Sequence, residues 1–410
     1  MKKNGFTLIE LLAVIVILAI IAVIAVPIVI NIIDDSKKNA SLRSADFYLD
    51  AVEMSVAQAT LKNKNIEDKT YNILENGNIC LEDYNSTSKK CVDSSDEGTD
   101  IDILEVEVNG EHPKEGTITI NNGNISNVDF EISENRVIKN DKGEIIYFPC
   151  TLISGEENTI GSKYECEVSP GTKYNFYILS YNDVNNKSTN DKTEAVTTNL
   201  IMDRNMCSDG TPTDANKEDK CTVAWYSTSQ TNEYGPVTAM TYLHNATKSW
   251  INIPSLNYTY NDRNFQGIAA DNTTIGYTSF VSNNGEATIT ALDGTTITPI
   301  GSKTEPLKAR MPIYTSNSTN SSKKEVTDSN GSNEYLYENL DSANNGEDWY
   351  GASGKQPTNN IDGIYAYWTL SSFAFDSRSA RYVSYGGGVN GSNVDNGSDR
   401  GVRAVINLKL

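Results

Sequence analysis

A single acidic residue, Glu10, stands at the start of an uncharged apolar run that extends from Leu11 to Ile33. A carboxylate at the edge of such a run is costly in lipid unless it finds a cationic partner. Glu10 therefore has the chemistry of a pairing site. The alternative is an interfacial acid whose side chain reaches water.

The rest of the chain offers little for catalysis. Its two histidines are His112, in a Glu-His-Pro turn, and His244, in a predicted helix. Neither is accompanied by a Ser or Cys nucleophile in a recognisable turn. We expect no enzymatic activity and no required cofactor.

Two groups of side chains carry the hard oxygen ligands that Ca²⁺ prefers. They are Asp395, Asn396 and Asp399, and Asp341, Asn344, Asn345 and Asp348. Neither group matches an EF-hand loop. We favour solvated turn residues over a metal site, and calcium binding is the alternative.

Six cysteines fall in three pairs that are close in the sequence. The pairs are Cys80 and Cys91, Cys150 and Cys166, and Cys207 and Cys221. None forms a Cys-x-x-Cys motif, so zinc and thioredoxin-like sites have little support. In an extracytoplasmic chain we expect three disulfides, most simply within each pair, although other pairings of six cysteines stay open.

The apolar run is long enough to cross a bilayer, since residues 11–33 span roughly 35 Å as a helix with about 1.5 Å rise per residue. Lys2 and Lys3 before it predict a short cytoplasmic leader, with the remainder outside. A cleaved secretory signal is the alternative, but its apolar core would be shorter and would end in an Ala-x-Ala-like site. We therefore expect a single-pass protein of the cell membrane with an extracytoplasmic carboxy-terminal domain.

Together these features resemble the amino terminus of type IV prepilins and of the related pseudopilins of type II secretion systems. Gly5, Phe6 and Glu10 match the motif of that family position by position. The resemblance implies that prepilin peptidase cuts after Gly5 and that Phe6 becomes N-methylated. It also implies that Glu10 pairs with the amino terminus of a neighbouring subunit, that lipid surrounds the helix before assembly, and that the assembled protein lies in a cell-surface pilus.

Beyond the apolar run the sequence becomes amphipathic without a break. Apolar residues recur at spacings of three and four from Leu42 to Ala59, with Asp46, Asp50 and Glu53 between them. This pattern predicts one long helix whose lower half packs against neighbours in a fibre and whose upper half packs on its own sheet.

The predicted fold class is α+β, in four parts. We expect a prepilin leader in residues 1–5, a transmembrane and assembly helix in 6–62, a pilin-type antiparallel sheet in 63–147 and a larger, mostly β domain in 148–410. In the sheet, short alternating runs joined by Asn-Gly turns indicate hairpins.

The carboxy-terminal domain contains all four tryptophans, which can build a second core. Strands are predicted at 174–181, 197–202, 222–227, 365–372, 381–386 and 402–408, and a helix at 238–250. The blocks LKARMPIYT (307–315), YWTLSS (367–372) and GVRAVINL (401–408) resemble those of C-type-lectin-like domains of the formylglycine-generating-enzyme type. Arg310-Met311-Pro312 departs from the Leu-Pro of that family, and Arg403 keeps its arginine. An ordinary antiparallel β domain is the alternative.

Residues 373–401 contain no Lys, Glu, Gln, Met or Trp. These five amino acids are unreachable when the adenines of an Asn codon ending in C or T are randomised. The segment therefore resembles the variable region of diversity-generating-retroelement target proteins, and Gly-Asn-rich turns are the alternative. Because Tyr, Ser, Gly and Asn make adaptable binding surfaces, we expect the segment to face an unidentified surface ligand. The residues expected to bind it are Asp376, Arg378, Arg381, Tyr382, Tyr385, Asn390 and Asn393.

The net charge of −20 argues against a nucleic-acid partner, because binding to phosphates needs clustered Lys and Arg. Two functions stay open. The first is a minor type IV pilin-like surface protein that joins other pilin subunits through its helix and displays an adhesin-like domain. The second is a pseudopilin of a type II secretion or DNA-uptake machine, with a structural or substrate-docking extra domain.

Overall fold

The computed structural model describes residues 36–37, 39–64, 66–85, 90–92, 102–108, 110–133, 135–140, 143–153, 155, 158–183, 188–189, 192–212, 221–228, 230–260, 266–268, 274–314, 366–373, 376–383, 389–397 and 400–410. Within them the fold is mainly β, with few helices and several antiparallel sheets. The chain divides into two compact units, Met1–Phe148 and Pro149–Leu410, which we describe separately.

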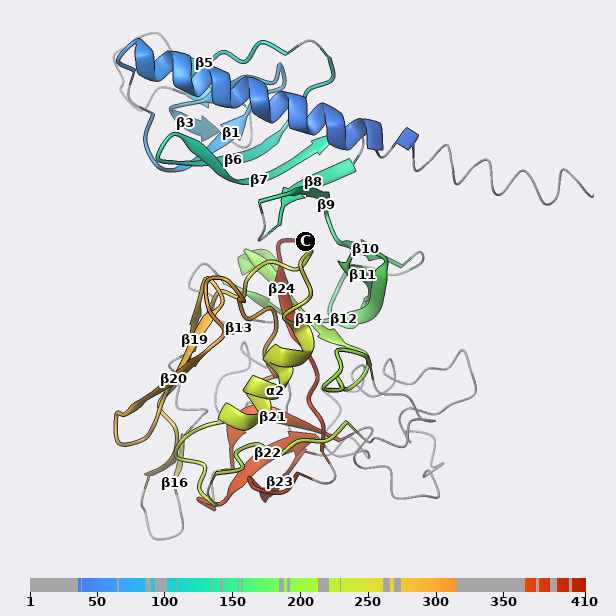
Figure 1. The fold of residues 1–410 in the computed structure, drawn as a ribbon, viewed down its shortest axis with the longest axis vertical. Helices are drawn as coiled ribbons and strands as arrows, with labels where there is room; N and C mark the ends of the chain where they lie inside the picture. Colours follow the sequence, from blue (N-terminus) through green and yellow to red (C-terminus); the bar gives the residue numbers. More distant parts are fainter. Residues whose placement is uncertain are drawn as a thin grey trace, which may run out of the picture. The chain divides into compact units, whose positions relative to one another are not determined.

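The first unit contains a helix that includes residues 39–61 and lies along one face of a sheet (Figure 1). Its apolar residues at spacings of three and four are buried against that sheet, and Tyr48 and Val52 are fully enclosed. The Tyr48 hydroxyl donates a hydrogen bond to the Gly77 carbonyl at 2.7 Å, and its ring meets Phe130 edge to face. The amphipathic pattern thus becomes the packing interface between helix and sheet.

The sheet of the first unit has seven strands in the order β5-β2-β1-β6-β7-β8-β9, all antiparallel. A separate pair joins β3 (Asp83–Asn85) to β4 (Lys90–Val92). The strands of the sheet are β1 (Thr70–Ile73), β2 (Ile79–Cys80), β5 (Ile103–Leu104), β6 (Gly116–Asn121), β7 (Asn124–Ile132), β8 (Asn135–Lys139) and β9 (Ile145–Tyr147). Between β6 and β7, Asn122 and Gly123 have φ of 51° and 75°. A two-residue Asn-Gly hairpin turn needs this left-handed backbone.

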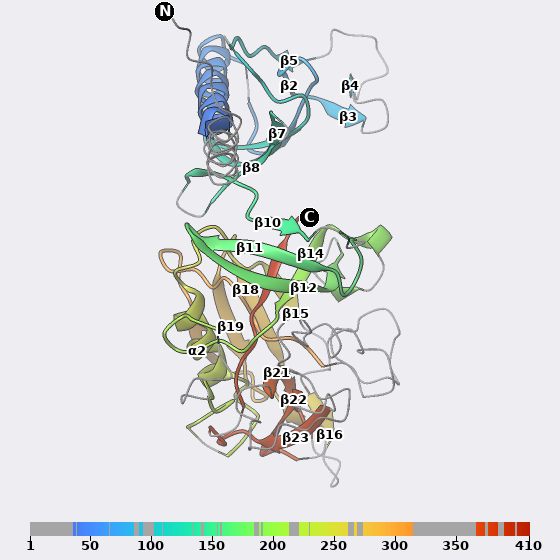
Figure 2. The same ribbon diagram turned by 90° about the vertical axis from the view of Figure 1, so that its right-hand side faces the viewer.

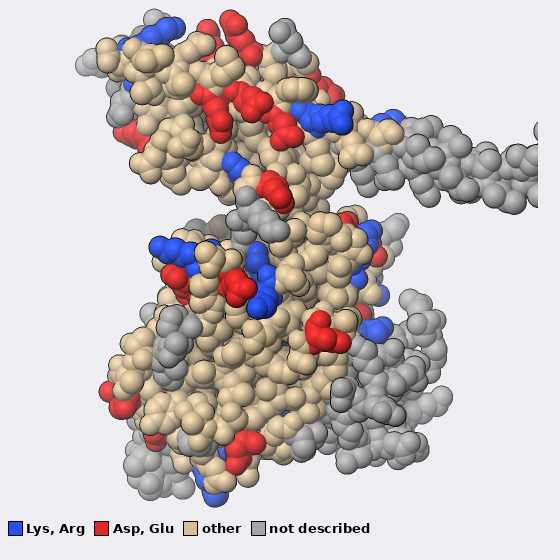
Figure 3. All heavy atoms as spheres, in the orientation of Figure 1, with Lys and Arg blue, Asp and Glu red and all other residues tan. Residues whose placement is uncertain are grey.

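The opposite face of the helix carries charge and exposed apolar side chains. Figure 3 shows acidic side chains gathered on the side of the first unit that carries the helix. Asp46 and Asp50 are among the exposed acids there. Partial burial and the neighbouring Asp50 raise the pKa of Asp46.

The largest sheet of the second unit runs in the order β10-β11-β12-β14-β24, with β13 beside β12. Its strands are β10 (Cys150–Leu152), β11 (Lys163–Ser169), β12 (Thr172–Asn182), β13 (Ser188–Thr189), β14 (Thr197–Met202) and β24 (Val405–Leu408), and a short 3-10 helix, η1, covers Lys192–Glu194. The carboxy-terminal strand β24 pairs with β14, so that Thr198 lies opposite Leu408. This pairing brings the end of the chain into the core of the unit.

Smaller sheets complete the second unit, and Figure 2 shows them around α2 and the large sheet. They contain β15 (Tyr258–Tyr260), β18 (Ser279–Asn283), β19 (Glu286–Thr290) and β20 (Thr296–Ile300); β16 (Gln266–Ile268) and β17 (Thr274–Gly276); and β21 (Tyr367–Ser372), β22 (Ser379–Val383) and β23 (Val389–Asn393). The helix α2 covers Val237–Thr247, close to the predicted segment.

One strand prediction is wrong. Residues 222–227 form no strand, because no neighbouring segment pairs with them residue by residue. Their backbone groups make isolated hydrogen bonds to separate residues instead. The N–H of Val223 donates to the Arg400 carbonyl at 2.9 Å, and that of Tyr226 donates to the Val394 carbonyl at 2.9 Å. The segment therefore lies beside the carboxy-terminal part of the chain without forming a β-ladder with it.

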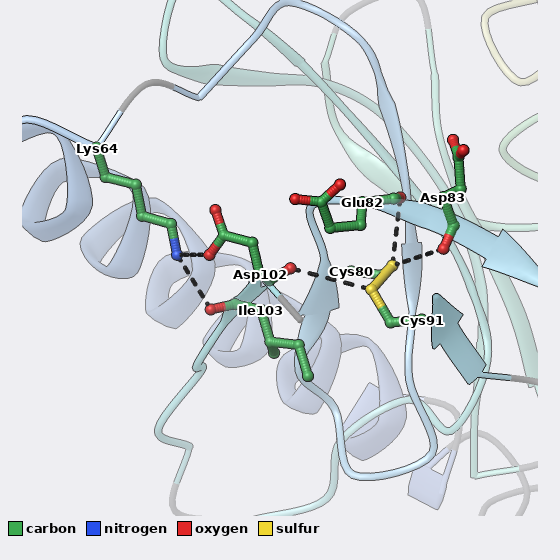
Figure 4. Close-up of a disulfide and its surroundings, with 7 residues drawn as sticks. All are labelled: Lys64, Cys80, Glu82, Asp83, Cys91, Asp102 and Ile103. Carbon is green, nitrogen blue, oxygen red and sulfur yellow. Dashed lines mark hydrogen bonds and ion pairs between the residues drawn. A yellow bond between two sulfur atoms is a disulfide. The ribbon is translucent and has the colours of Figure 1, made fainter. Parts of the chain in front are cut away.

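The cysteines pair as Cys80 with Cys91, Cys150 with Cys166 and Cys207 with Cys221, with Cα–Cα distances of 5.5, 4.0 and 4.5 Å. Figure 4 shows the first of these bonds. Cys80 Sγ lies 3.3 Å from the Glu82 carbonyl oxygen. Nearby, Lys64 at the end of the helix pairs with Asp102 and donates to the Ile103 carbonyl at 3.3 Å. These contacts fasten β5 to the helix.

We expect labelling of the denatured, unreduced chain with a thiol reagent to find no free cysteine, and labelling after reduction to find six. Closing loops of this size stabilises a fold by a few kcal/mol in the chain-entropy model. Reduction is therefore expected to lower the midpoint of urea unfolding. Six reactive thiols before reduction would contradict the extracytoplasmic placement of both units.

Candidate ligand-binding surface

The amino-terminal residues expected to act, Gly5, Phe6 and Glu10, lie outside the described residues. In the part of the chain that the structure does describe, no helix is both long and apolar enough to cross a membrane. The residues predicted to bind a ligand belong to the second unit.

Strands β22 and β23 lie within the segment predicted to face a ligand, and β22 also pairs with β21, which comes just before that segment. Across β22 and β23, Arg381 lies opposite Gly391 and Ser379 lies opposite Asn393. Directly opposed residues share a face, and successive residues alternate between faces. Arg381 and Asn393 therefore lie on one face of this sheet, and Tyr382 lies on the other.

Two aromatic rings contact the guanidinium of Arg381. Its Cζ atom lies 4.4 Å from the centroid of the Tyr314 ring and 4.4 Å from that of the Phe373 ring. Phe373 packs on Gly391, where an added Cβ would stand 2.5 Å from the ring. The Ser371 hydroxyl holds Tyr314, accepting from its N–H at 3.0 Å and donating to its carbonyl at 3.1 Å. We call Tyr314, Phe373 and Arg381 the Arg381 clamp.

On the other face, Tyr382 belongs to a stack that holds the sheet in place. Its ring centroid lies 5.9 Å from that of Trp368 and 4.0 Å from Cζ of Arg400. Trp368 is fully buried, and its indole N–H donates to the Val223 carbonyl at 2.7 Å. The structure therefore gives Tyr382 a packing role and separates it from Arg381.

Asp376 forms the turn between β21 and β22. Its carboxylate accepts hydrogen bonds from the Arg378 backbone N–H at 3.0 Å and from the Ser379 hydroxyl at 2.9 Å. The bond from the Arg378 backbone lowers the pKa of Asp376, and the Arg378 guanidinium acts in the same direction. Fully buried Asn232 donates to the Asp376 and Ser379 carbonyls at 3.1 and 2.7 Å. Both carboxylate oxygens of Asp376 thus shape the loop.

The remaining predicted residues are dispersed. Asn393 is exposed on the face of Arg381, and Asn390 lies opposite Tyr382. Tyr385 lies outside the described residues. The structure therefore brings Arg381 and Asn393 to one face and does not bring all seven residues together.

The oxygen-rich groups considered for calcium are mostly outside the described residues, namely Asp341, Asn344, Asn345, Asp348 and Asp399. Asp395 accepts a hydrogen bond from the Gln230 amide at 3.0 Å. Among the described residues, no three His, Cys, Asp or Glu side chains are grouped to hold a metal ion.

The two histidines lie in different units. His112 packs on Gly77 in the first unit, and its Nδ1 lies 3.1 Å from the Pro113 carbonyl oxygen. His244 lies in α2 of the second unit, where burial lowers the pKa of its imidazole.

Arg310 and Arg403, from the sequence blocks 307–315 and 401–408, are core residues. Arg403 is 1% exposed, its Cζ lies 4.5 Å from the Tyr367 ring centroid, and its Nε donates to Asn205 at 3.1 Å. Arg310 is fully buried, with Cζ 4.1 Å from the Tyr258 ring centroid. These arginines stack on aromatic rings inside the unit, so they position the surface without belonging to it.

Sequence reasoning missed Tyr314 and Phe373 as the rings that hold Arg381, and Asn232 as the residue that holds the Asp376 turn. Tyr314 is remote from Arg381 in the sequence, and only the fold joins them. The one available signal was that arginine and aromatic residues recur together in the carboxy-terminal segments.

Residues 1–26 match the family model of the prokaryotic N-terminal methylation motif. No curated protein and no solved structure matches the chain. The resemblance of the carboxy-terminal region to C-type-lectin-like domains therefore has no support from these comparisons. The motif contains Gly5, Phe6 and Glu10, and it supports a type IV pilin-like or pseudopilin protein that is membrane-anchored or pilus-associated.

Proposed function

We propose that this chain is a minor pilin-like surface protein that enters a pilus through its amino-terminal helix and displays the second unit for ligand binding. The observation that carries this proposal is the methylation motif at residues 1–26. The apolar run that follows leads into the helix that packs on the first unit. One segment therefore joins a membrane-compatible end to a folded unit.

A stripe of exposed apolar residues on the helix supports the assembly role. Phe47, Met54 and Leu61 are 66%, 64% and 84% exposed and recur every seven residues. With 3.6 residues per turn, they lie on the side of the helix opposite its buried face. Exposed large apolar side chains aligned on one surface mark an interaction site more often than isolated ones do. They fit a neighbouring subunit.

The face of β22 and β23 that carries half-buried Arg381 and exposed Asn393 supports the binding role. It presents Arg381 between aromatic contacts and an exposed amide at Asn393. The second unit, with 262 residues in Pro149–Leu410, is bulky for a subunit repeated along a fibre. We therefore place the protein among minor subunits and assign it no enzymatic activity, cofactor or nucleic-acid partner.

Replacing Glu10 with alanine tests the assembly role. The variant removes a charge partner and makes the helix more lipid-soluble, so the chain is expected to insert and fold but not to enter filaments. Immunoblotting of sheared filaments and of membranes measures both pools. Glu131→Ala, at an exposed position on β7, is the matched control and is expected to assemble normally. Normal incorporation of Glu10→Ala would contradict the proposal.

A pseudopilin of a secretion or DNA-uptake machine shares the same amino-terminal motif. Gold labelling of the second unit in electron micrographs separates the two functions. Label along or at the tip of surface filaments supports the pilus. Label confined to the cell envelope, with loss of secretion or uptake in a deletion strain, supports the machine.

A further inference from the structure

The Arg381 guanidinium meets its two aromatic neighbours through contacts that leave its hydrogen-bond donors unused. A cation above a ring interacts with the π face, whereas the five N–H donors of a guanidinium lie in its plane and point outward at its edges. No hydrogen bond or ion pair to the Arg381 side chain occurs among the described residues, and its Nε atom is buried without a partner. The rings fix the position of the charge, and no described acceptor neutralises it.

The acids nearest in the sequence are already engaged. Both carboxylate oxygens of Asp376 accept hydrogen bonds within its own turn. Asp395 accepts a hydrogen bond from Gln230. A partly buried cation that has no counter-charge among the described residues carries a desolvation cost, which an anion supplied from outside would offset.

The surroundings of the clamp favour a ligand whose anionic group is attached to a neutral part that is rich in hydroxyl groups. Exposed Asn393 shares the face of Arg381, so the surface beside the guanidinium offers an amide group. Amides both donate and accept hydrogen bonds, as sugar hydroxyls require. Phe373 is half-buried, so the part of its ring that is not packed on Arg381 and Gly391 supplies some apolar surface for the carbon face of a sugar ring.

We propose that the Arg381 clamp binds the carboxylate of an acidic saccharide, of the uronic acid class. This proposal rests on the binding role proposed above and names the ligand chemistry of that surface. The planar guanidinium fork matches a carboxylate through two parallel hydrogen bonds. Tyr314 and Phe373 hold the fork in one orientation, so little side-chain freedom is lost when the ligand arrives.

Isothermal titration calorimetry of the detergent-solubilised full chain tests the clamp. The probes are an oligogalacturonate and its methyl ester, which has the same sugar rings and no free carboxylate. We expect measurable binding of the oligogalacturonate and at least about tenfold weaker binding of the ester, since charge-assisted hydrogen bonds are lost. Absence of oligogalacturonate binding, or equal binding of the two probes, would overturn the proposal.

Three variants locate the site. Arg381→Gln is expected to weaken oligogalacturonate binding at least about tenfold, and Arg381→Lys is expected to restore only part of it because an ammonium lacks the planar fork. Asn393→Asp places a negative charge on the same face at an exposed position, so it should weaken binding without disturbing the core. Lys173→Gln, which removes an exposed cation paired with Glu165, is the charge-matched control and should bind as wild type does.

The outcomes separate this proposal from the assembly role. Wild-type affinity in both Arg381→Gln and Asn393→Asp would reject the clamp, whatever the filaments show. Equal affinity for an oligoglutamate peptide would reject the saccharide class. Arg381→Gln chains should still be processed and enter filaments, so a failure of the wild-type chain to assemble would contradict the proposed function and leave the binding result standing.

Discussion

Chains in which Gly5 is replaced by leucine are expected to accumulate in the membrane as uncleaved precursor. The methylation motif at residues 1–26 implies cleavage after Gly5, and we expect a bulky side chain there to block the peptidase. The wild-type chain should then begin at N-methylated Phe6. Mass spectrometry of the amino-terminal peptide measures both properties, and immunoblotting measures the size of the retained form.

The matched control is Asn4→Leu, which places the same side chain one residue before the glycine and should be processed more efficiently than the Gly5 variant. A wild-type terminus at Met1, or one near Ala25 as a secretory signal peptidase would leave, contradicts the pilin-like processing. Because uncleaved subunits lack the free amino group expected to pair with Glu10, the Gly5 variant should also be absent from filaments.

Replacing Trp225 with alanine is expected to destabilise the second unit by about 3–5 kcal/mol, the range for removing a large buried aromatic side chain. Trp225 is fully buried, and its indole N–H donates to the Thr369 carbonyl of β21 at 2.8 Å. Tyr277, whose ring centroid lies 6.0 Å away, donates to the next carbonyl, that of Leu370, at 2.7 Å. The variant loses packing and leaves a buried acceptor in the strand beside the clamp.

Urea unfolding followed by tryptophan fluorescence measures this loss, because all tryptophans belong to the second unit and three remain in the variant. Trp225→Phe is the matched comparison: it keeps most of the ring volume and loses the indole donor, so a smaller loss of roughly 1–3 kcal/mol is expected. An unchanged midpoint for Trp225→Ala would contradict the assigned core position. The first unit, followed by hydrogen exchange of its backbone amides in the unreduced chain, should unfold as in the wild-type chain.

Several local elements could be predicted because their causes are local. The spacing of apolar residues from Leu42 to Ala59 defines a helix face that remains buried in the fold. Asn122 and Gly123 form a hairpin turn because these residue types tolerate a positive φ. Residues 197–202 combine β-branched and apolar side chains, and they coincide with β14. The cysteine pairs lie close enough in the chain for the simplest pairing to occur.

Predictions that depended on contacts between residues far apart in the sequence were less accurate. Residues 222–227 have the composition of a strand, but their neighbours are single carbonyls and N–H groups of the carboxy-terminal segment, so no ladder forms. The predicted binding residues include Tyr382 and Asp376, which the fold uses for packing and for a turn. Neither role can be read from composition, because Tyr and Asp serve binding and structure equally well.

By itself, then, the sequence determined the motif at residues 1–26, the amphipathic helix and the oxidised cysteine pairs, since each depends on residues that are neighbours in the chain. Only the tertiary structure decided which arginines are fully buried and which are only half-buried. Arg310 and Arg403 stack on rings within the core, whereas half-buried Arg381 of β22 meets Tyr314 and Phe373. The physical reason is that an arginine's role depends on the rings and acceptors that surround its guanidinium, and strand pairing across long loops supplies those neighbours.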